Sequence, residues 1–213
     1  MRDSPRHIVL TGNTGFKIAN FRRGLIRTLI SEGHSVTVVA PSDVHFTSLE
    51  ALGCAVVPIT MDRNGTAPLA EARLALQILA ALQRLRPDVV FSYTIKNNIY
   101  SGLACRLLRI PFAPNVTGLG PAFNRKGLLN RLVRGLYRQA FRRARTVFFQ
   151  NTQDRDVFLQ AGLVDSQVAR LLPGSGVDLQ QFSARPLPPD TDGIVFLFVA
   201  RLLWDKGLGV LAE

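Results

Sequence analysis

The stretch IVFLFVARLLWDKG at Ile194–Gly207 decides how this chain divides into domains. Its apolar, β-branched first half, Ile194–Ala200, is typical of a strand buried on both faces of a parallel sheet. Arg201 and Lys206 follow, before a glycine that is expected to open a helix, and cations at a helix N-terminus suit a bound diphosphate. Charge spacing alone favours a surface loop, but the preceding sequence already predicts a complete α/β domain. We therefore predict that this strand begins a second domain, and that the sequence ends at Glu213 before that domain can close.

The composition is that of a globular protein with enough apolar residues for a core. Of the 213 residues, 47% are hydrophobic and 19% are charged. No apolar run approaches the roughly 20 residues of a membrane-spanning helix. No signal peptide is expected, because Arg6 and His7 lead directly into a strand. Cys54 and Cys105 lie far apart and are interpreted as buried apolar residues, in agreement with a cytoplasmic location.

The net charge of +11 comes from one interval of the chain. Between Val89 and Gln153 there are 11 Lys and Arg residues but no Asp or Glu, whereas the other 15 basic residues are balanced by 15 acidic ones. Such a field attracts a polyanion or an anionic surface. A nucleic-acid partner is not expected, because the sequence has no RNA- or DNA-binding motif.

Strands and helices alternate strictly along the first 172 residues. The predicted strands are short and mostly apolar, at His7–Thr11, Ser35–Ala40, Ala55–Pro58, Val89–Tyr93, Phe112–Val116, Thr146–Phe149 and Val168–Leu172. Such alternation requires right-handed crossovers, so we predict an α/β fold with a doubly wound parallel sheet. Residues 173–192 are rich in Gly and Pro, as linkers are. The predicted parts are a Rossmann-like domain over 1–172, a linker over 173–192 and the start of a second Rossmann-like domain over 193–213.

The predicted helix at Lys126–Ala144 has two chemically different faces. Helical spacing of about 100° per residue groups one set of apolar residues: Leu129, Leu132, Leu136, Ala140 and Ala144. The opposite side carries a stripe of arginines. Together with two preceding cations, the stripe supplies the candidates for facing a membrane: Arg125, Lys126, Arg131, Arg134, Arg138 and Arg142. A solvated helix face is the alternative that stays open.

Polar loops follow several of the predicted strands. Open parallel sheets bind ligands at the carboxyl ends of their strands, where small polar side chains can hydrogen-bond a sugar or a phosphate. The candidates for an acceptor or sugar pocket are Asn13, Thr14, Gly15, Asn20, Arg22, Thr94, Lys96, Asn115, Thr117 and Gly118. Turn chemistry alone would also select several of them. No catalytic residue is assigned and no metal or cofactor is expected, because the sequence has no Ser/His/Asp triad, HExxH motif or Cys/His cluster.

The turn at Thr11–Phe16 also suggests an NAD(P)-binding sugar-nucleotide epimerase or dehydrogenase. Three features weigh against that interpretation. Ile18 replaces the third glycine of the motif, the second strand ends without an acidic residue, and no Tyr-x-x-x-Lys pair is present. This hypothesis is therefore the runner-up.

Six successive segments resemble one family of enzymes. They are Asn20–Pro41, Thr94–Pro111, Asn115–Phe123 (NVTGLGPAF), Val147–Phe158, Gly174–Phe182 (GSGVDLQQF) and Phe198–Gly207 (FVARLLWDKG). Together they look like bacterial retaining glycosyltransferases of family four, which have the GT-B fold. The similarity is greatest to members that build polysaccharide or glycan repeat units on undecaprenyl diphosphate.

The resemblance implies two Rossmann-like domains with an active site in the cleft between them. The acceptor would bind mainly to the N-terminal domain and the nucleotide-sugar donor mainly to the C-terminal one, where Arg201 and Lys206 match the family's diphosphate-binding residues. The implied activity is sugar transfer to a polyprenyl-diphosphate-linked acceptor with retention of configuration. The resemblance also implies that the protein binds peripherally to the anionic inner face of the cytoplasmic membrane.

Two departures from the family pattern matter. Thr117 stands where many members have a donor-contacting His, and the family's Glu-x7-Glu motif would lie beyond residue 213. We therefore expect a C-terminally truncated enzyme that is inactive alone. A non-catalytic, basic membrane-binding module is the further alternative.

Overall fold

The chain divides into two units, Met1–Asp178 and Leu179–Glu213. The computed structural model describes residues 4–63, 65–119, 123, 127–186, 193, 196–200, 207 and 209–210. The first unit contains the sheet and the helices described below.

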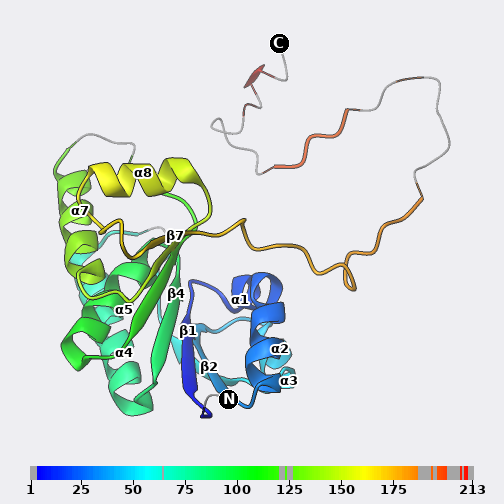
Figure 1. Cartoon of the computed structure of the whole chain (residues 1–213), viewed down its shortest axis with the longest axis horizontal. Coiled ribbons are helices and arrows are strands. Elements are labelled where there is room, and N and C mark those ends of the chain that lie inside the picture. The colour runs from blue at the N-terminus through cyan, green and yellow to red at the C-terminus, as the bar shows by residue number, and fades with distance from the viewer. Residues whose placement is uncertain are drawn as a thin grey trace. The chain divides into compact units, whose positions relative to one another are not determined.

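One parallel sheet of seven strands forms the centre of the first unit, in the order β3-β2-β1-β4-β5-β6-β7 (Figure 1). The strands are β1 (His7–Thr11), β2 (Ser35–Pro41), β3 (Ala55–Ile59), β4 (Val89–Tyr93), β5 (Phe112–Val116), β6 (Val147–Phe149) and β7 (Ala169–Leu171). Every neighbouring pair is parallel. The chain moves outward from β1 to β3, and then crosses back to β4 and continues to the other edge. This reversal makes the sheet doubly wound, as the sequence predicted.

Helices cover both faces of the sheet (Figure 1). Their bounds are α1 (Gly15–Phe21), α2 (Arg23–Ser31), α3 (Phe46–Ala51), α4 (Pro68–Leu85), α5 (Ile95–Leu108), α7 (Leu128–Phe141) and α8 (Thr152–Gln160). Successive strand residues point to opposite faces. Ile8 and Leu10 therefore pack in a core with residues of α1, α2 and α3, whereas Val9 belongs to a core with residues of α4, α5, α7 and α8.

The strand predicted at Ile194–Ala200 is not found in its described part. Residues 196–200 have no strand conformation and pair with no other described residue. A strand is stable only beside a hydrogen-bonded neighbour, so the apolar, β-branched pattern alone was not sufficient. All four described side chains with large apolar groups in this segment are exposed: Phe196, Leu197, Phe198 and Val199.

The inward face of α7 differs from the predicted one. Leu129 and Leu132, expected on the apolar side, are 46% and 59% exposed, whereas Tyr137 and Phe141 are buried. The two buried rings pack edge to face against each other, with centroids 5.1 Å apart, and both contact Phe158 of α8. At 100° per residue, including these rings turns the buried face by about 50° from the leucine pattern. The leucines of the first turns are therefore left on the surface.

Candidate functional site

A cavity of about 270 Å³ lies at the carboxyl ends of β1, β4, β5 and β6. Its lining comes from the loops after these strands, from α1 and from the segment after β7. The lining residues are Gly12, Asn13, Lys17, Ile18, Phe21, Arg22, Tyr93, Thr94, Thr117, Gln150 and Ser175. The structure thus brings together four of the predicted pocket residues, Asn13, Arg22, Thr94 and Thr117, at the edge where parallel sheets bind ligands.

Arg22 supplies a positive charge to this cavity. It lies between α1 and α2, with its guanidinium carbon 4.2 Å from the centre of the Tyr93 ring, within the range of a cation–π contact. Its Nη1 donates hydrogen bonds to Ser175 Oγ at 3.0 Å and to the Phe21 carbonyl at 3.2 Å. Ser175 Oγ is also 3.2 Å from Gln150 Nε2. The guanidinium is therefore held in one orientation by groups from three parts of the chain.

Burial changes the protonation properties of this pair. Desolvation lowers the pKa of Arg22 below its ordinary value. Burial raises the pKa of Tyr93 to about 12, and the nearby Arg22 charge opposes that rise. At neutral pH Tyr93 is therefore a neutral phenol beside a charged guanidinium, and the pair carries one positive charge.

Thr94 has a strained backbone. Its φ of 75° and ψ of 156° lie in a region that essentially only glycine adopts, yet it is a β-branched residue at the start of α5. Its Oγ1 accepts a hydrogen bond from Asn97 Nδ2 at 3.1 Å. Asn98, the next residue of α5, donates from Nδ2 to the Asn115 carbonyl at 3.0 Å. These bonds fasten the start of α5 to its own N-cap and to β5, and so hold Thr94 in its strained conformation beside the cavity.

Three buried amide oxygens lie along this same edge without a hydrogen-bond partner among the described residues: Asn13 Oδ1, Asn97 Oδ1 and Asn115 Oδ1. Buried polar atoms in native proteins nearly always have a partner, so such atoms call for an explanation. Amide oxygens accept hydrogen bonds from hydroxyl groups. Asn13 lines the cavity, where a hydroxyl-bearing ligand would satisfy its oxygen.

Local structure accounts for two other candidates, Thr14 and Gly15. Thr14 Oγ1 caps α1 by accepting a hydrogen bond from the Lys17 N–H at 3.1 Å. A Cβ at Gly15 would lie 2.5 Å from Asp43 Oδ1 and 2.9 Å from Phe46 Cδ1. Helix capping and close packing thus select both residues without a ligand. Asn20 and Gly118 are half-buried and, like these two, are not among the lining residues.

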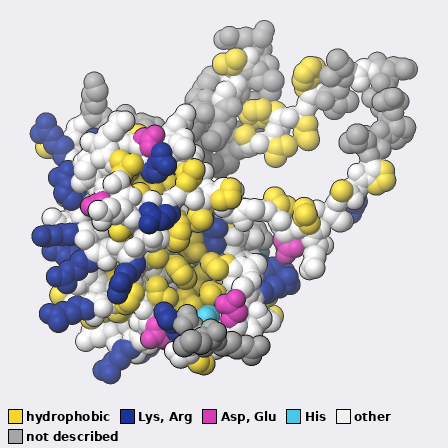
Figure 2. All heavy atoms as spheres, viewed as in Figure 1, with side chains coloured by type: hydrophobic (Ala, Val, Ile, Leu, Met, Phe, Trp, Pro, Cys, Tyr) yellow, Lys and Arg dark blue, Asp and Glu magenta, His cyan; other side chains and the backbone are white. Residues whose placement is uncertain are grey.

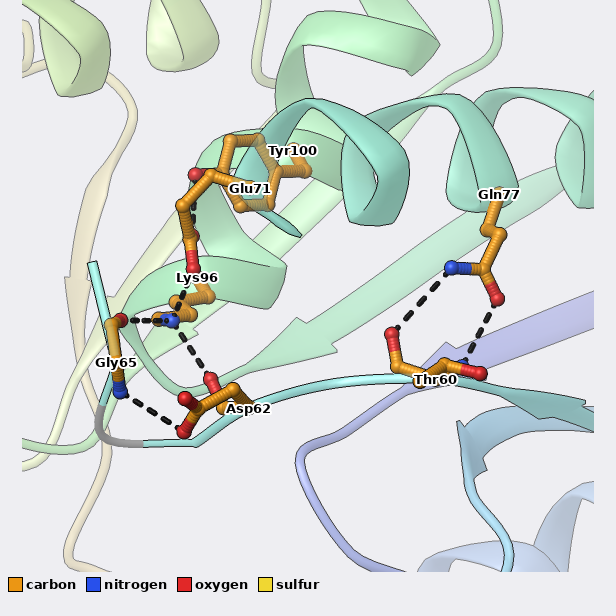
Figure 3. A network of polar contacts seen from close by, with 7 residues as sticks. All are labelled: Thr60, Asp62, Gly65, Glu71, Gln77, Lys96 and Tyr100. Carbon is orange, nitrogen blue, oxygen red and sulfur yellow. Dashed lines mark hydrogen bonds and ion pairs between the residues drawn. The ribbon is translucent and has the colours of Figure 1, made fainter. Parts of the chain in front are cut away.

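Lys96 lies apart from the cavity lining, in a polar network that joins α4, α5 and the loop after β3 (Figure 3). Its Nζ donates to the carbonyls of Asp62 at 2.7 Å and Gly65 at 2.6 Å, and forms an ion pair with Glu71. The Tyr100 hydroxyl donates to the other Glu71 oxygen at 2.6 Å. The Lys96 charge is thus neutralised locally while its hydrogen bonds hold the loop.

Sequence reasoning missed Tyr93 and Ser175, although both line the cavity. Tyr93 was interpreted as the end of a buried strand, and Ser175 as part of a linker. A polar aromatic residue at the carboxyl end of a strand was the available signal for Tyr93. The donor-site candidates Arg201 and Lys206 lie outside the described residues, as do the membrane candidates Arg125 and Lys126.

The described ranges contain no group of three or more His, Cys, Asp or Glu residues placed to hold a metal ion. Among the helices described, none combines the length and the apolar character needed to cross a membrane.

Relatives of known sequence share most of this chain. The chain is 26% identical to a Campylobacter jejuni protein named N,N'-diacetylbacillosaminyl-diphospho-undecaprenol alpha-1,3-N-acetylgalactosaminyltransferase. The match covers 92% of this chain but 56% of that relative, so the chain spans about half of the relative's length.

Solved structures share the fold. A glycosyltransferase from Rickettsia africae superposes with a TM-score of 0.61 at 14% identity, covering 87% of this chain and 47% of that one. The Anabaena protein HepE, crystallised with UDP and glucose, gives a TM-score of 0.62 at 16% identity over 85% of this chain and 47% of HepE. The model of the glycosyl transferase 4-like domain matches residues 18–174, which include most of the sheet and of the cavity lining. The chain therefore belongs to the glycosyl transferase 4-like domain family.

Proposed function

We propose that this chain provides the acceptor-binding half of a glycosyltransferase. The enzyme transfers a sugar from a nucleotide-sugar donor to a polyprenyl-diphosphate-linked acceptor, with retention of configuration, in cell-surface polysaccharide or glycan synthesis. The family membership and the similarity to the Campylobacter transferase support this assignment. The observation that carries it is the cavity at the carboxyl ends of the strands, where the Arg22 guanidinium and Asn13, whose Oδ1 is unpaired, occur together.

The cavity has the two chemistries that a sugar diphosphate requires. Arg22 presents a guanidinium, which binds phosphate oxygens through charge-assisted hydrogen bonds. Asn13 and Thr94 present groups that bind sugar hydroxyls. Thr117, which follows β5, also lines this cavity. Arg201 and Lys206 are proposed to neutralise the leaving nucleoside diphosphate, since stabilising charge as it develops is the main electrostatic demand of such a transfer.

Acceptor binding can be tested directly. The probe is N,N'-diacetylbacillosaminyl-diphospho-undecaprenol, the acceptor in the Campylobacter relative's name, in nanodiscs. Arg22→Gln should weaken binding at least tenfold, because a hydrogen bond to a charged group contributes about 1.5–3 kcal/mol. Arg23→Gln is the matched control, since Arg23 is adjacent but does not line the cavity, and it should bind within about twofold of wild type. Equal affinities for wild type and Arg22→Gln would contradict the assignment of this cavity.

Sugar transfer needs a second experiment. A chimera that joins this chain to the donor-binding domain of the Campylobacter relative should extend the lipid-linked acceptor when given radiolabelled nucleotide sugars. Absence of extended product, while the relative itself is active in the same assay, would contradict the proposed reaction.

The proposal includes peripheral binding to the anionic inner face of the cytoplasmic membrane through α7. Figure 2 shows Lys and Arg side chains gathered over this helix. Three exposed leucines, Leu128, Leu129 and Leu132, begin it, and Arg131 is exposed beside them. Arg142 is also exposed but follows the last residue of α7. Each Lys or Arg near an anionic bilayer contributes about 1 kcal/mol, and a leucine buried from water contributes about 1.5–3 kcal/mol.

Arg138 belongs to this stripe by sequence but has a structural partner. Its Nε donates to the Gly162 carbonyl at 3.1 Å and its Nη2 to the Ala161 carbonyl at 3.0 Å, at the end of α8. We therefore assign membrane contact to the leucines and to Arg131, in the first turns of α7, rather than to the whole stripe.

Vesicle co-sedimentation tests this surface. Changing Leu128, Leu129 and Leu132 to Gln should abolish binding to vesicles containing phosphatidylglycerol. The control changes Leu69, Leu76 and Leu107 to Gln, since these leucines are similarly exposed but lie on α4 and α5, and it should bind normally. Equal binding by both variants would leave α7 as a solvated helix.

A further inference from the structure

A second cavity, of about 210 Å³, lies at the amino ends of the strands, on the opposite side of the sheet from the first cavity. Four arginines surround it: Arg106 and Arg109 at the end of α5, and Arg143 and Arg145 after α7. Its floor is apolar and includes the buried residues Phe112 and Ala140. We call it the arginine pocket.

The arginine pocket is distinct from the cavity of about 270 Å³ at the carboxyl ends of the strands, which we call the acceptor cavity. It includes Phe112, the first residue of β5, whereas the acceptor cavity includes Thr117, which follows the last residue of β5. At about 3.3 Å per strand residue, roughly 16 Å separate these two positions. A ligand in one cavity therefore cannot occupy the other.

Among the described residues, no acidic side chain forms an ion pair with the arginines of this pocket. Within the described part of the chain, the side chains of Arg109, Arg143 and Arg145 make no hydrogen bond or ion pair, and Arg106 donates only to Gln139. Two acidic residues precede neighbouring strands here. Asp165, before β7, lines another cavity together with Arg142 and Ala144, and Asp88 precedes β4. Asp88 Oδ2 accepts a hydrogen bond from the His7 N–H at 2.7 Å, on the side of β1 and away from β5.

Helix dipoles offset part of this positive charge. Both α5 and α7 run from the carboxyl end of one strand to the amino end of the next, so both present their negative ends here. Each end is equivalent to roughly −0.5 elementary charge. Even if the carboxylates of Asp88 and Asp165 are both added, about one positive charge of the four remains. A phosphate monoester carries about −1.5 to −2 at neutral pH.

We propose that the arginine pocket binds a phosphate group. Its volume equals that of about seven water molecules at about 30 Å³ each, which is enough for a phosphate with its ester oxygen. Guanidinium groups bind phosphate oxygens in pairs, through parallel N–H···O bonds. The phosphate can belong to a free small molecule or to the headgroup of an anionic lipid, and the apolar floor accommodates the atoms next to the ester. This proposal does not rest on the proposed sugar transfer.

The test compares two triple variants of the full chain that lose the same charge. The pocket variant is Arg109→Asn/Arg143→Gln/Arg145→Gln, and Arg106 is kept because it holds Gln139 of α7. The control variant is Arg73→Gln/Arg84→Gln/Arg86→Asn, on and after α4. The control variant matches the pocket variant closely. Arg86 and Arg109 both end a helix in the left-handed conformation, with φ of 45° and 59°, and Asn tolerates this conformation.

Two arms distinguish the source of the phosphate. Calorimetric titration with sodium phosphate measures free phosphate, and co-sedimentation with phosphatidylglycerol vesicles, against phosphatidylcholine vesicles, measures the headgroup. In at least one arm the pocket variant should bind at least tenfold more weakly than wild type, while the control variant stays within about twofold. Dependence on the pocket in the first arm indicates a free phosphate, and dependence in the vesicle arm alone indicates a lipid headgroup.

Two results would overturn the proposal. One is that binding weakens equally in both variants, which would mean that binding depends only on the net charge of the protein. The other is no dependence on the pocket in either arm. If the triple pocket variant does not fold, as judged by its circular dichroism melt, the single changes Arg109→Asn and Arg86→Asn decide. Arg109→Asn should then weaken binding at least threefold, and Arg86→Asn should leave binding unchanged.

Discussion

The strain at Thr94 predicts an unusual order of stability for two substitutions. Both Thr94→Ala and Thr94→Gly remove the hydroxyl that accepts the hydrogen bond from Asn97. Alanine must keep the unfavourable backbone conformation, whose cost is about 1–3 kcal/mol, whereas glycine adopts it without strain. Glycine in turn costs about 0.5–1 kcal/mol of additional chain entropy on folding. The glycine variant should therefore be more stable than the alanine variant by about 1 kcal/mol.

The measurement is urea unfolding followed by circular dichroism, with the midpoints compared at equal slope. Thr117 provides the control, because it is an exposed residue of a neighbouring loop and its φ is not positive. There the order should reverse, with Thr117→Ala more stable than Thr117→Gly by about 0.4–1 kcal/mol. If Thr94→Ala is as stable as Thr94→Gly, the cavity edge is unstrained and the reasoning is refuted.

Three other predictions concern packing, the Lys96 network and the thiols. Gly102→Ala should destabilise the fold by about 1–3 kcal/mol in urea unfolding, because its Cβ would lie 2.8 Å from Ala140 Cβ. Gly24→Ala, in an open position of α2, should be neutral or stabilising. Lys96→Met should cost about 1–3 kcal/mol and speed hydrogen exchange at Gly65, and unchanged exchange would deny Lys96 this role. Burial raises the pKa of Cys54 to about 11 and of Cys105 to about 12, so neither thiol should react with a disulfide reagent at pH 8. Since the folded pKa values exceed the ordinary value of 9.0, their contribution to stability is complete below pH 9 and should fall as the pH rises toward 11–12.

The sheet could be predicted from sequence because each strand is a local pattern. His7–Thr11 and Phe112–Val116 are short runs between breakers, and their bounds in the structure are the predicted ones. The strand predicted at Ile194–Ala200 had the same local pattern but is not found in its described part, because pairing depends on a neighbouring strand that the pattern does not contain. Local sequence therefore predicts the tendency to form a strand, and the neighbours decide the outcome.

The candidate site was predictable to the extent that it depends on strand ends. Thr94 and Thr117 follow strands directly, and the cavity contains both. Lys96 follows the same strand as Thr94, but its partner Glu71 lies on another helix, 25 residues earlier in the chain. Ser175 lies in the segment after β7, which starts at the carboxyl ends of the strands because β7 is parallel to β6, and it joins the cavity through contacts with Arg22 and Gln150. Contacts between segments distant in sequence decided both outcomes.

The direction of α7 separates the two places that attract anions. Its 14 residues span about 21 Å at 1.5 Å per residue. It begins with exposed leucines on the side of the carboxyl strand ends and ends at the arginine pocket. This length exceeds the Debye length of about 8 Å at physiological ionic strength, so the charges at one end scarcely affect an exposed ligand at the other. Arg22→Gln should therefore leave phosphate binding in the arginine pocket unchanged, and the pocket variant should leave acceptor binding unchanged. A membrane that contacts the first turn of α7 would bring lipid-linked acceptors to the edge that contains the acceptor cavity, and the arginine pocket would be left for a separate phosphate.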